Sequence, residues 1–356
     1  MIKLESHIGF RQRLIMATLS GKPIRIDKIR PDDDNPGLRE YEASFLRLIE
    51  KLTNGSTIEI NYTGTSIVYR PGVIVGGKIE HDCGPSGRSI GYFLEAIIPL
   101  APFSKLPFQI SLQGVTNDNA DISVDLIRTV SLRHLKRFGI EDNVELKINK
   151  RGAPPLGGGE VYFSCSTIRQ LKPIRVLEEG RIKRIRGIAY STRVSPQTTN
   201  RVVEAARSVL NRYIPDIFIV TDAYKKNESG KSPGYGLSLV AESTTDVLVS
   251  AEYFAGPGET PEDLGIRVAR MLLAEIQDGG CVDSLHHSLY LLWMVLCPED
   301  VSKLRIGQLT PFCMEFLRDL RTFFNVTFKI QPDATTRSVL LTCLGTGFVN
   351  ISKKTN

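Results

Sequence analysis

The chain has 356 residues, of which 42% are hydrophobic and 24% charged, a composition ordinary for a globular protein large enough for two or three domains. Its six cysteines form no Cys-x-x-Cys pair and have no matching histidine spacing, which argues against a zinc site and against a disulfide framework. The apolar runs at 14–19 and 291–297 are too short for a signal peptide or a membrane span, so we expect no membrane association.

The net charge of +6 is unevenly distributed along the chain. Residues 128–186 contain fourteen Lys or Arg and six Asp or Glu, so the remainder of the chain is slightly acidic. A local excess of positive charge is what salt-sensitive binding to an RNA backbone requires, because each neutralised phosphate releases condensed counterions. A dock for an acidic protein segment, or plain solubility, would leave the same pattern in the sequence.

Strand-like and helix-like segments alternate through the first half of the chain. Short strands are predicted at 24–26 and 58–60, on either side of a helix over 39–52. A second helix over 124–138 buries its apolar residues and leaves four basic residues on its outer face: Arg128, Arg133, Lys136 and Arg137. This alternation predicts an α/β or α+β architecture.

A self-contained pattern begins after the charged run at 178–184. Its predicted elements are strands at 185–190 and 217–220, a helix at 200–213, and a hairpin formed by 237–242 and 247–253. Thr260 and Pro261 then begin a helix that ends at Gly279. We therefore predict an inserted α/β domain at 184–279 within a discontinuous large domain, 1–183 and 280–356.

The most distinctive local motif is a basic pair, Lys150 and Arg151, that leads through two prolines into Gly157, Gly158 and Gly159. Glycines open positive φ, so backbone N–H groups here could turn toward an anion that the two cations also attract. A tight turn between strands at 144–148 and 161–164 would need the same glycines for geometry alone. The residues themselves leave both interpretations open.

The pattern Arg-Gly-x-x-Pro-x-Gly-Gly-Gly-x-Val at 151–161 resembles the signature of the RNA 3′-terminal phosphate cyclases. The segments 69–77, 84–89 and 279–283 follow in that family's order and at about its spacing, and the match runs over almost the whole chain. It is closest to the cyclase-like branch of nucleolar ribosome-biogenesis proteins. The resemblance implies a large domain of repeated units, each with two helices on a four-stranded sheet, and a smaller inserted α/β domain.

The resemblance also shows where the enzyme's chemistry should stand. In the cyclases a histidine attacks the α-phosphate of ATP, and the adenylate is passed to an RNA 3′-phosphate. The corresponding position here is Leu285, and we expect a helix over 284–296 to turn it toward the core. His286 and His287 point elsewhere on such a helix, and we expect cap, surface or RNA-contact roles for them.

Other parts of the family's nucleotide site are altered as well. Of the amino-terminal nucleotide loop only Arg11 is retained, and Leu156 stands where a lysine is common. Pro85 and Ser86 replace a Thr-Ala pair, and Arg88 adds a positive charge just after them. These changes imply lost ATP chemistry and no cofactor, and His81 with Asp82 and Cys83 lacks the second ligand pair of a metal site.

We therefore expect a non-catalytic cyclase-like factor. The family branch implies small-subunit (18S) pre-rRNA processing in the nucleus, within the nucleolar small-subunit processome and together with a ribosome-biogenesis GTPase. The predicted anion or RNA site consists of Arg88, Lys150, Arg151, Gly157, Gly158 and Gly159.

Two enzymatic alternatives remain. An endoribonuclease acting on pre-rRNA would use Arg318 and Asp319 together with His286 or His287, although an ordinary ion pair on a helix surface also accounts for the first two. Residual ATP-dependent cyclase activity is the third interpretation.

Overall fold

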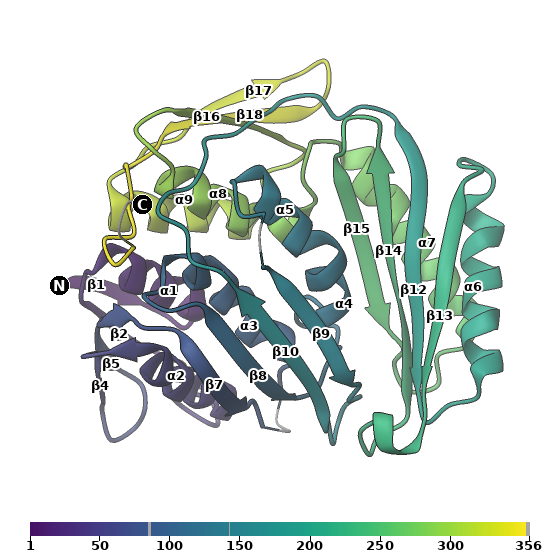
Figure 1. Cartoon of the computed structure of the whole chain (residues 1–356), viewed down its shortest axis with the longest axis horizontal. Coiled ribbons are helices and arrows are strands. Elements are labelled where there is room, and N and C mark those ends of the chain that lie inside the picture. The colour runs from purple at the N-terminus through teal and green to yellow at the C-terminus, as the bar shows by residue number, and fades with distance from the viewer. Residues whose placement is uncertain (85–86, 142, 354–356) are drawn as a thin grey trace.

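The computed structural model describes residues 1–84, 87–141 and 143–353. These residues form four four-stranded sheets and one two-stranded sheet, with helices packed between and beside them (Figure 1). None of their helices combines the length and the apolar composition that a membrane crossing requires. The mixed architecture expected from the sequence is confirmed.

Three of the four-stranded sheets belong to repeated units. The elements of the first unit are β1 (Ile2–Glu5), α1 (Phe10–Ser20), β2 (Ile24–Asp27), α2 (Glu40–Leu52), β4 (Thr57–Ile60) and β5 (Ile67–Arg70). The elements of the second are β7 (Gly77–Asp82), α3 (Ile90–Leu100), β8 (Phe108–Gly114), α4 (Val124–Leu126), the π-helical turn η2 (Ile127–Ser131), α5 (Leu132–Arg137), β9 (Glu145–Lys150) and β10 (Gly159–Cys165). The elements of the third are β11 (Arg175–Val176), the 3₁₀ turn η4 (Ser284–His286), α8 (His287–Leu296), β16 (Val301–Ile306), α9 (Pro311–Phe324), β17 (Lys329–Asp333) and β18 (Ser338–Leu344).

The strand order is the same in all three units. In each sheet the first two strands are parallel, the second also pairs with the fourth, and the third lies at the edge. The short strands β3 (Thr53–Asn54) and β6 (Val73–Ile74) pair between the first two units. The resemblance thus correctly implied repeated units, although no internal repeat is evident in the sequence. A strand needs only a pattern of apolar positions, which many different residues satisfy.

The fourth sheet is formed by the part of the chain that runs from β11 to η4 of the third unit. Its segment contains β12 (Ile182–Thr192), α6 (Pro196–Leu210), β13 (Ile217–Tyr224), β14 (Gly234–Ser243), β15 (Leu248–Phe254) and α7 (Pro261–Asp278). The strand order is β13-β12-β14-β15. Helix α6 packs on β12 and β13, and α7 packs on β14 and β15. We call this segment the insert; its separation as a domain stays a prediction.

Helices from all three units pack against one another in the interior. Helix α1 contacts α3 and α9, while α8 contacts α3 and α9 (Figure 1). Trp293 of α8 is fully buried in this layer. The arrangement brings the first turns of these four helices, or the residues just before them, to one side of the large domain, where they meet the insert.

Candidate functional site

A cavity of about 570 Å³ lies where the three repeated units and the insert meet. Arg11 comes from the first turn of α1, Arg88 precedes α3, Leu285 precedes α8, and Phe312 begins α9. The N-terminus of a helix carries positive partial charge. Four such ends around one cavity resemble the place where an enzyme would hold phosphate groups.

The charged side chains that line this cavity are nevertheless mainly acidic. Against the two cations Arg11 and Arg88 stand six carboxylates: Glu95, Asp118, Asp121, Glu252, Glu275 and Asp278. Burial raises the pKa of Glu252 to about 7, although Ser123 and Ser238 donate hydrogen bonds to its carboxylate. An ATP triphosphate would enter a site whose own charge repels it.

Both arginines of the cavity are already paired. Arg11 binds Glu95 at 2.5 Å and donates to the carbonyl oxygen of Tyr92 at 2.6 Å. Arg88 holds Asp121 with two hydrogen bonds, of 2.6 and 2.5 Å, and its guanidinium carbon lies 4.7 Å from the ring centre of Tyr92. Arg88 therefore lines the cleft, as its place in the family motif implies, but its charge is compensated. Pro85 and Ser86 lie outside the described residues.

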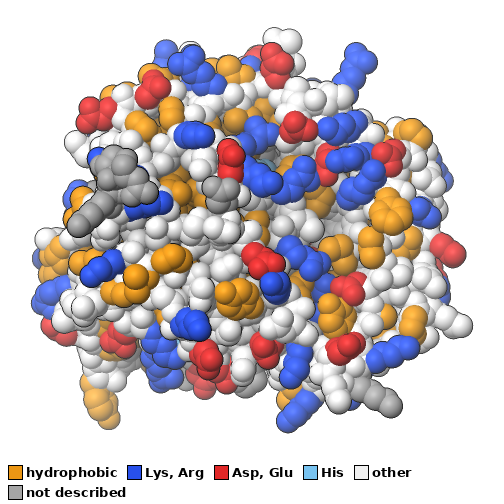
Figure 2. All heavy atoms as spheres, viewed as in Figure 1, with side chains coloured by type: hydrophobic (Ala, Val, Ile, Leu, Met, Phe, Trp, Pro, Cys, Tyr) orange, Lys and Arg blue, Asp and Glu red, His pale blue; other side chains and the backbone are white. Residues whose placement is uncertain are grey.

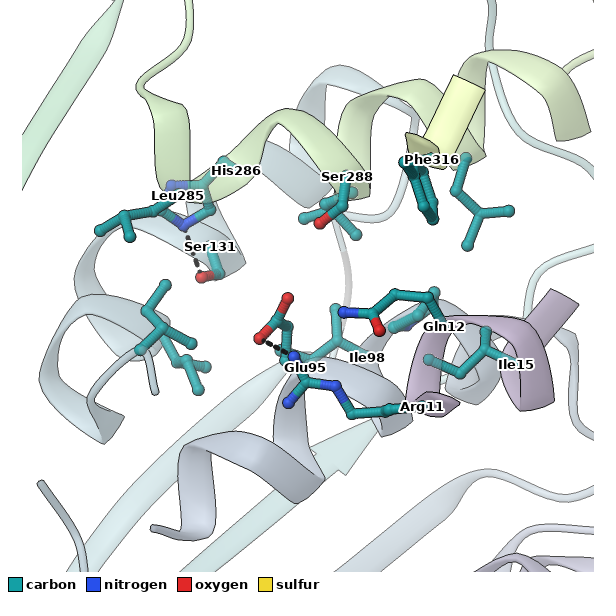
Figure 3. Close-up of a pocket in the computed structure, with 15 residues that line it drawn as sticks. Arg11, Gln12, Ile15, Glu95, Ile98, Ser131, Leu285, His286, Ser288 and Phe316 are labelled. Atoms are coloured by element: carbon teal, nitrogen blue, oxygen red, sulfur yellow. Dashed lines mark hydrogen bonds and ion pairs between the residues drawn. The ribbon is translucent and has the colours of Figure 1, made fainter. Parts of the chain in front are cut away.

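Leu285 is on the wall of this cavity and does not face the core. Its exposed fraction is 43%, and it lines both the large cavity and a smaller one of about 30 Å³, which Figure 3 shows. The expectation of a buried leucine was wrong because residues 284–286 form a 3₁₀ turn, and α8 begins only at His287. Residues in a 3₁₀ turn are spaced by about 120° rather than 100°, which rotates Leu285 away from the apolar stripe of α8.

His286 is the middle member of a buried line of hydrogen bonds. Its Nδ1 lies 2.5 Å from Oδ1 of Asp283, and its Nε2 lies 2.8 Å from Oγ of Ser131 (Figure 3). Burial opposes ionisation of Asp283, but the interactions with His286 and a hydrogen bond from Ser250 lower its pKa to about 2. The anionic Asp283 favours the tautomer of His286 with the proton on Nδ1. In this tautomer Nε2 accepts a hydrogen bond from the hydroxyl of Ser131.

This line has the connectivity of a serine–histidine–aspartate relay, but little space surrounds it. Ser131 and His286 are only 3% and 2% exposed, and the cavity beside them has a volume of about 30 Å³, roughly the share of one water molecule. The relay fastens η4 to η2. His287 is also buried, and burial lowers its pKa below the usual value. Surface and RNA-contact roles for the two histidines are therefore excluded in this conformation.

The residues considered for an endoribonuclease do not form one site. Asp319 binds Nε of Arg13 at 3.0 Å and lines a separate cavity of about 300 Å³ beside the loop at 5–9. Burial raises the pKa of Asp319, although Arg13 works in the opposite direction. Arg318 is exposed and pairs with Glu315. Positions 318 and 319 point about 100° apart on α9, so the two side chains separate.

Arg151 does not take part in an anion site. Its side chain is fully buried and forms two hydrogen bonds of 2.7 Å to Asp125 and one of 2.9 Å to Asp222. The guanidinium also lies over the rings of Tyr190 and Tyr224. Arg151 therefore links α4 of the second unit to β12 and β13 of the insert, and its charge is not available to an external ligand.

The glycine loop is a close backbone junction, not a phosphate cradle. A Cβ on Gly157 would lie 3.0 Å from the backbone of Gly114, and one on Gly230 of the insert would lie 1.8 Å from the carbonyl oxygen of Gly157. The N–H of Leu156 donates to Ser232 at 3.1 Å, and that of Gly157 donates to Ala153 at 3.0 Å. The geometric interpretation of this loop was thus the right one.

The same packing accounts for the remaining members of the predicted anion site. A Cβ on Gly158 would lie 3.3 Å from the backbone of Gly230, and one on Gly159 would lie 2.6 Å from the side chain of Thr116. Lys150 is exposed at the end of β9. Neither Lys150 nor the three glycines line the cavity that Arg88 lines, so the predicted set does not come together.

Sequence reasoning missed the carboxylates of the cavity and the partners of Arg151. Asp121, Asp125, Asp222 and Glu252 come from separate segments, and none belongs to a motif. Only Asp283 had a local signal, since an Asp just before a helix is a preferred N-cap, and its carboxylate does accept from the N–H of His286.

Comparison with known proteins identifies the family of this chain. The family model described as RNA 3′-terminal phosphate cyclase matches residues 2–330. A probable RNA 3′-terminal phosphate cyclase-like protein of Dictyostelium discoideum is 55% identical over 100% of both chains. The RNA 3′-terminal phosphate cyclase-like protein of Homo sapiens is 55% identical over 96% of this chain and 95% of its own. An rRNA processing protein of Schizosaccharomyces pombe is 51% identical over 96% of this chain and 95% of its own. The chain belongs to the RNA 3′-terminal phosphate cyclase family.

Proposed function

We propose that this protein is a non-catalytic member of its family that acts in ribosome biogenesis, in the maturation of small-subunit (18S) pre-rRNA. In this proposal it works in the nucleolus as part of the small-subunit processome, and it binds pre-rRNA, a ribosome-biogenesis GTPase, or both. Relatives that carry the name rRNA processing protein support the biological setting. Relatives named cyclase-like are consistent with a departure from the parent activity.

The observation that carries the non-catalytic part is Leu285. By the family resemblance this position holds the nucleophilic histidine, and here a hydrocarbon side chain is exposed to the cavity in its place. An aliphatic group has no lone pair with which to attack phosphorus. His286 does not replace it, because both of its ring nitrogens are engaged and its side chain is buried.

The charge of the cavity supports the same conclusion independently. Even with a nucleophile in place, the triphosphate of ATP would face Glu95, Asp118 and Asp121, while Arg11 and Arg88 are held by Glu95 and Asp121. Like charges oppose binding, and each arginine would have to leave a carboxylate before it could contact phosphate. The loss therefore extends from the attacking atom to the binding of the nucleotide.

Depletion and complementation test the biological role. When the protein is depleted from cells of its source organism, unprocessed 18S precursors should accumulate while large-subunit precursors mature normally. Wild-type protein and a Leu285→Ala variant should restore processing equally, because the side chain at this position performs no chemistry. Normal 18S maturation in depleted cells would refute the role in small-subunit processing.

A biochemical assay tests the absence of cyclase chemistry. Purified protein incubated with ATP labelled at the α-phosphate should acquire no acid-labile label, and an RNA with a 3′-phosphate should remain uncyclised. Covalent labelling of the wild-type protein would contradict the proposal. The endoribonuclease alternative gains no support from the positions of Arg318, Asp319 and His286, and an uncleaved precursor fragment would remove it.

A further inference from the structure

A second concave surface lies outside the cavity described above. Its volume is about 340 Å³, and it is formed between η2 and α5 of the second unit and the sheet of the insert. We call it the basic groove, and the lining residues used below are Arg128, Arg133, Arg186, Phe218, Val220 and Glu242. Figure 2 shows Lys and Arg side chains gathered in the upper part of the view, where α5 of the large domain meets the insert.

Among the described residues, Arg128 and Arg133 of the basic groove keep hydrogen-bond donors free for a ligand, whereas Arg186 already holds Asp216 with two hydrogen bonds. Arg133 gives one nitrogen to Glu242 at 2.7 Å, and its side chain is 42% exposed. Arg128 lies 3.5 Å from Asp125, a carboxylate that Arg151 already neutralises, and is 37% exposed. A guanidinium has five N–H donors, so these single contacts leave most of its donors unused.

Glu242 holds the arginines in place rather than cancelling their charge. Its carboxylate binds Arg133 from α5 and Arg184 from β12, at 2.7 and 2.8 Å. Burial opposes its ionisation, but the two arginines lower its pKa, so it remains charged at neutral pH. One buried carboxylate therefore restrains the guanidinium group of Arg133, which reduces the entropy lost when Arg133 binds a phosphate; Arg184, on the other side of Glu242, does not line the groove.

Exposed apolar side chains alternate with the charges on the same face of the insert. Arg186 of β12 lies opposite Phe218 of β13, and Ile188 lies opposite Val220. Phe218 is 57% exposed and Val220 is 47% exposed. Their neighbours along β13, Ile217 and Ile219, are buried, as expected for a strand with one side against the core. An exposed aromatic ring beside guanidinium groups is a surface on which a nucleobase can stack.

We propose that the basic groove binds a segment of single-stranded RNA, with phosphates on Arg128 and Arg133 and a base on Phe218. This deepens the proposed function and rests on its premise that the protein binds pre-rRNA. The volume suits one or two nucleotides rather than a duplex, because it lies near the lower end of the roughly 300–1,000 Å³ of small-ligand sites. A peptide made of Asp and Glu alone would satisfy the arginines but has no flat ring to stack on Phe218.

Fluorescence anisotropy of a labelled twelve-nucleotide oligouridylate, titrated with the full-length protein between 50 and 200 mM salt, tests this proposal. Two phosphate contacts should contribute about 1.4 to the slope of log affinity against log salt, at about 0.7 per contact. The double variant Arg128→Gln/Arg133→Gln should lose that slope and bind at least about tenfold more weakly. Phe218→Ala should weaken binding by about tenfold and leave the slope unchanged.

Matched controls lie on the first unit, away from the basic groove. Arg70 is exposed and pairs with one glutamate, and Tyr62 is fully exposed. Arg70→Gln and Tyr62→Ala should bind as the wild type does. The arginines and Phe218 are all at least about a third exposed, so their replacement should leave the circular dichroism spectrum unchanged.

The outcomes separate this proposal from the proposed function. If the wild type binds RNA and both groove variants bind it equally well, the assignment of the RNA site to the basic groove is wrong, while RNA binding by the protein stands. If the wild type fails to bind the RNA but binds an oligoglutamate through the same arginines, the occupant is an acidic peptide and the RNA proposal is overturned. Neither result bears on 18S precursor accumulation in depleted cells, which tests the biological role by itself.

Discussion

Replacing Arg151 with methionine distinguishes a structural arginine from an anion-binding one. The sequence placed Arg151 in a ligand site, whereas the structure buries it completely between Asp125 and Asp222. Although burial works against its charged form, these carboxylates raise the pKa of Arg151 above the usual value. Removal of the guanidinium leaves the fully buried carboxylate of Asp125 without its main partner.

The expected cost is about 3–5 kcal/mol of unfolding free energy, the range for removing one member of a buried ion pair. Asp222 contributes less, because its side chain is 32% exposed and water can replace the lost contact. The loss should become smaller as the pH falls from 7 to 5, since an unpaired buried carboxyl has a raised pKa and protonation removes its charge. Replacing Asp125 with asparagine in the same chain should recover part of the loss.

Urea unfolding followed by two probes measures this effect. The only tryptophan, Trp293, is buried in α8 and reports on the large domain, whereas far-ultraviolet circular dichroism reports on all helices and strands. If Arg151 links the insert to the second unit, the two transitions should separate in the Arg151→Met variant. A variant that unfolds like the wild type but binds RNA with a smaller salt slope would refute this reasoning and restore the anion-site interpretation.

Three further predictions concern single positions. Glu252 has a pKa of about 7 in the folded protein against 4.5 for a free glutamate, so the native state binds a proton that the unfolded chain releases. The free energy of unfolding should therefore fall as the pH rises from about 4.5 to 7. Urea titrations of Glu252→Gln should show up to about 3 kcal/mol less of this pH dependence. Gly230→Ala should cost about 1–3 kcal/mol because its Cβ would overlap the Gly157 carbonyl, whereas Gly256→Ala, with open space around it, should be neutral by thermal unfolding. Leu285→His should not acquire label from ATP, because the surrounding carboxylates still repel the triphosphate; a labelled histidine would show that only the nucleophile had been lost.

Local signals predicted elements well wherever the physical cause was local. Thr260 followed by Pro261 correctly indicated the start of α7, and the Thr260 hydroxyl accepts from the N–H of Asp263. Ser195 and Pro196 carry the same signature, yet the predicted helix began four residues later, at 200, because its apolar periodicity becomes evident only there. The π turn η2 within the helix predicted over 124–138 had no signal, since π turns depend on tertiary contacts.

The site could not be predicted in the same way, because its interactions join distant parts of the chain. Asp125 lies 26 residues before Arg151 and Asp222 lies 71 residues after it, so no local pattern marks the pair. From the sequence alone, an arginine beside a glycine loop is therefore expected to contact solvent or a ligand. Leu285 shows the converse case: the family resemblance assigns a position to this residue, but a single 3₁₀ turn decides which way it faces.

In the proposed function, the cleft is a phosphate site that has been silenced without a change of fold. Four helix ends converge on it, and Arg11, which the family resemblance assigns to the nucleotide loop, lines it. Asp121 lies between the two arginines of the cleft. Its carboxylate is 2.5 Å from Nη2 of Arg88 and 3.8 Å from Nη1 of Arg11, and its side chain is 1% exposed. An internal carboxylate satisfies the arginines at no cost in association entropy, so a nucleotide must compete with a group that is always present. In this proposal the cleft is closed to anions and the exposed arginines of the basic groove are the site for RNA, so the two sites should respond to different substitutions.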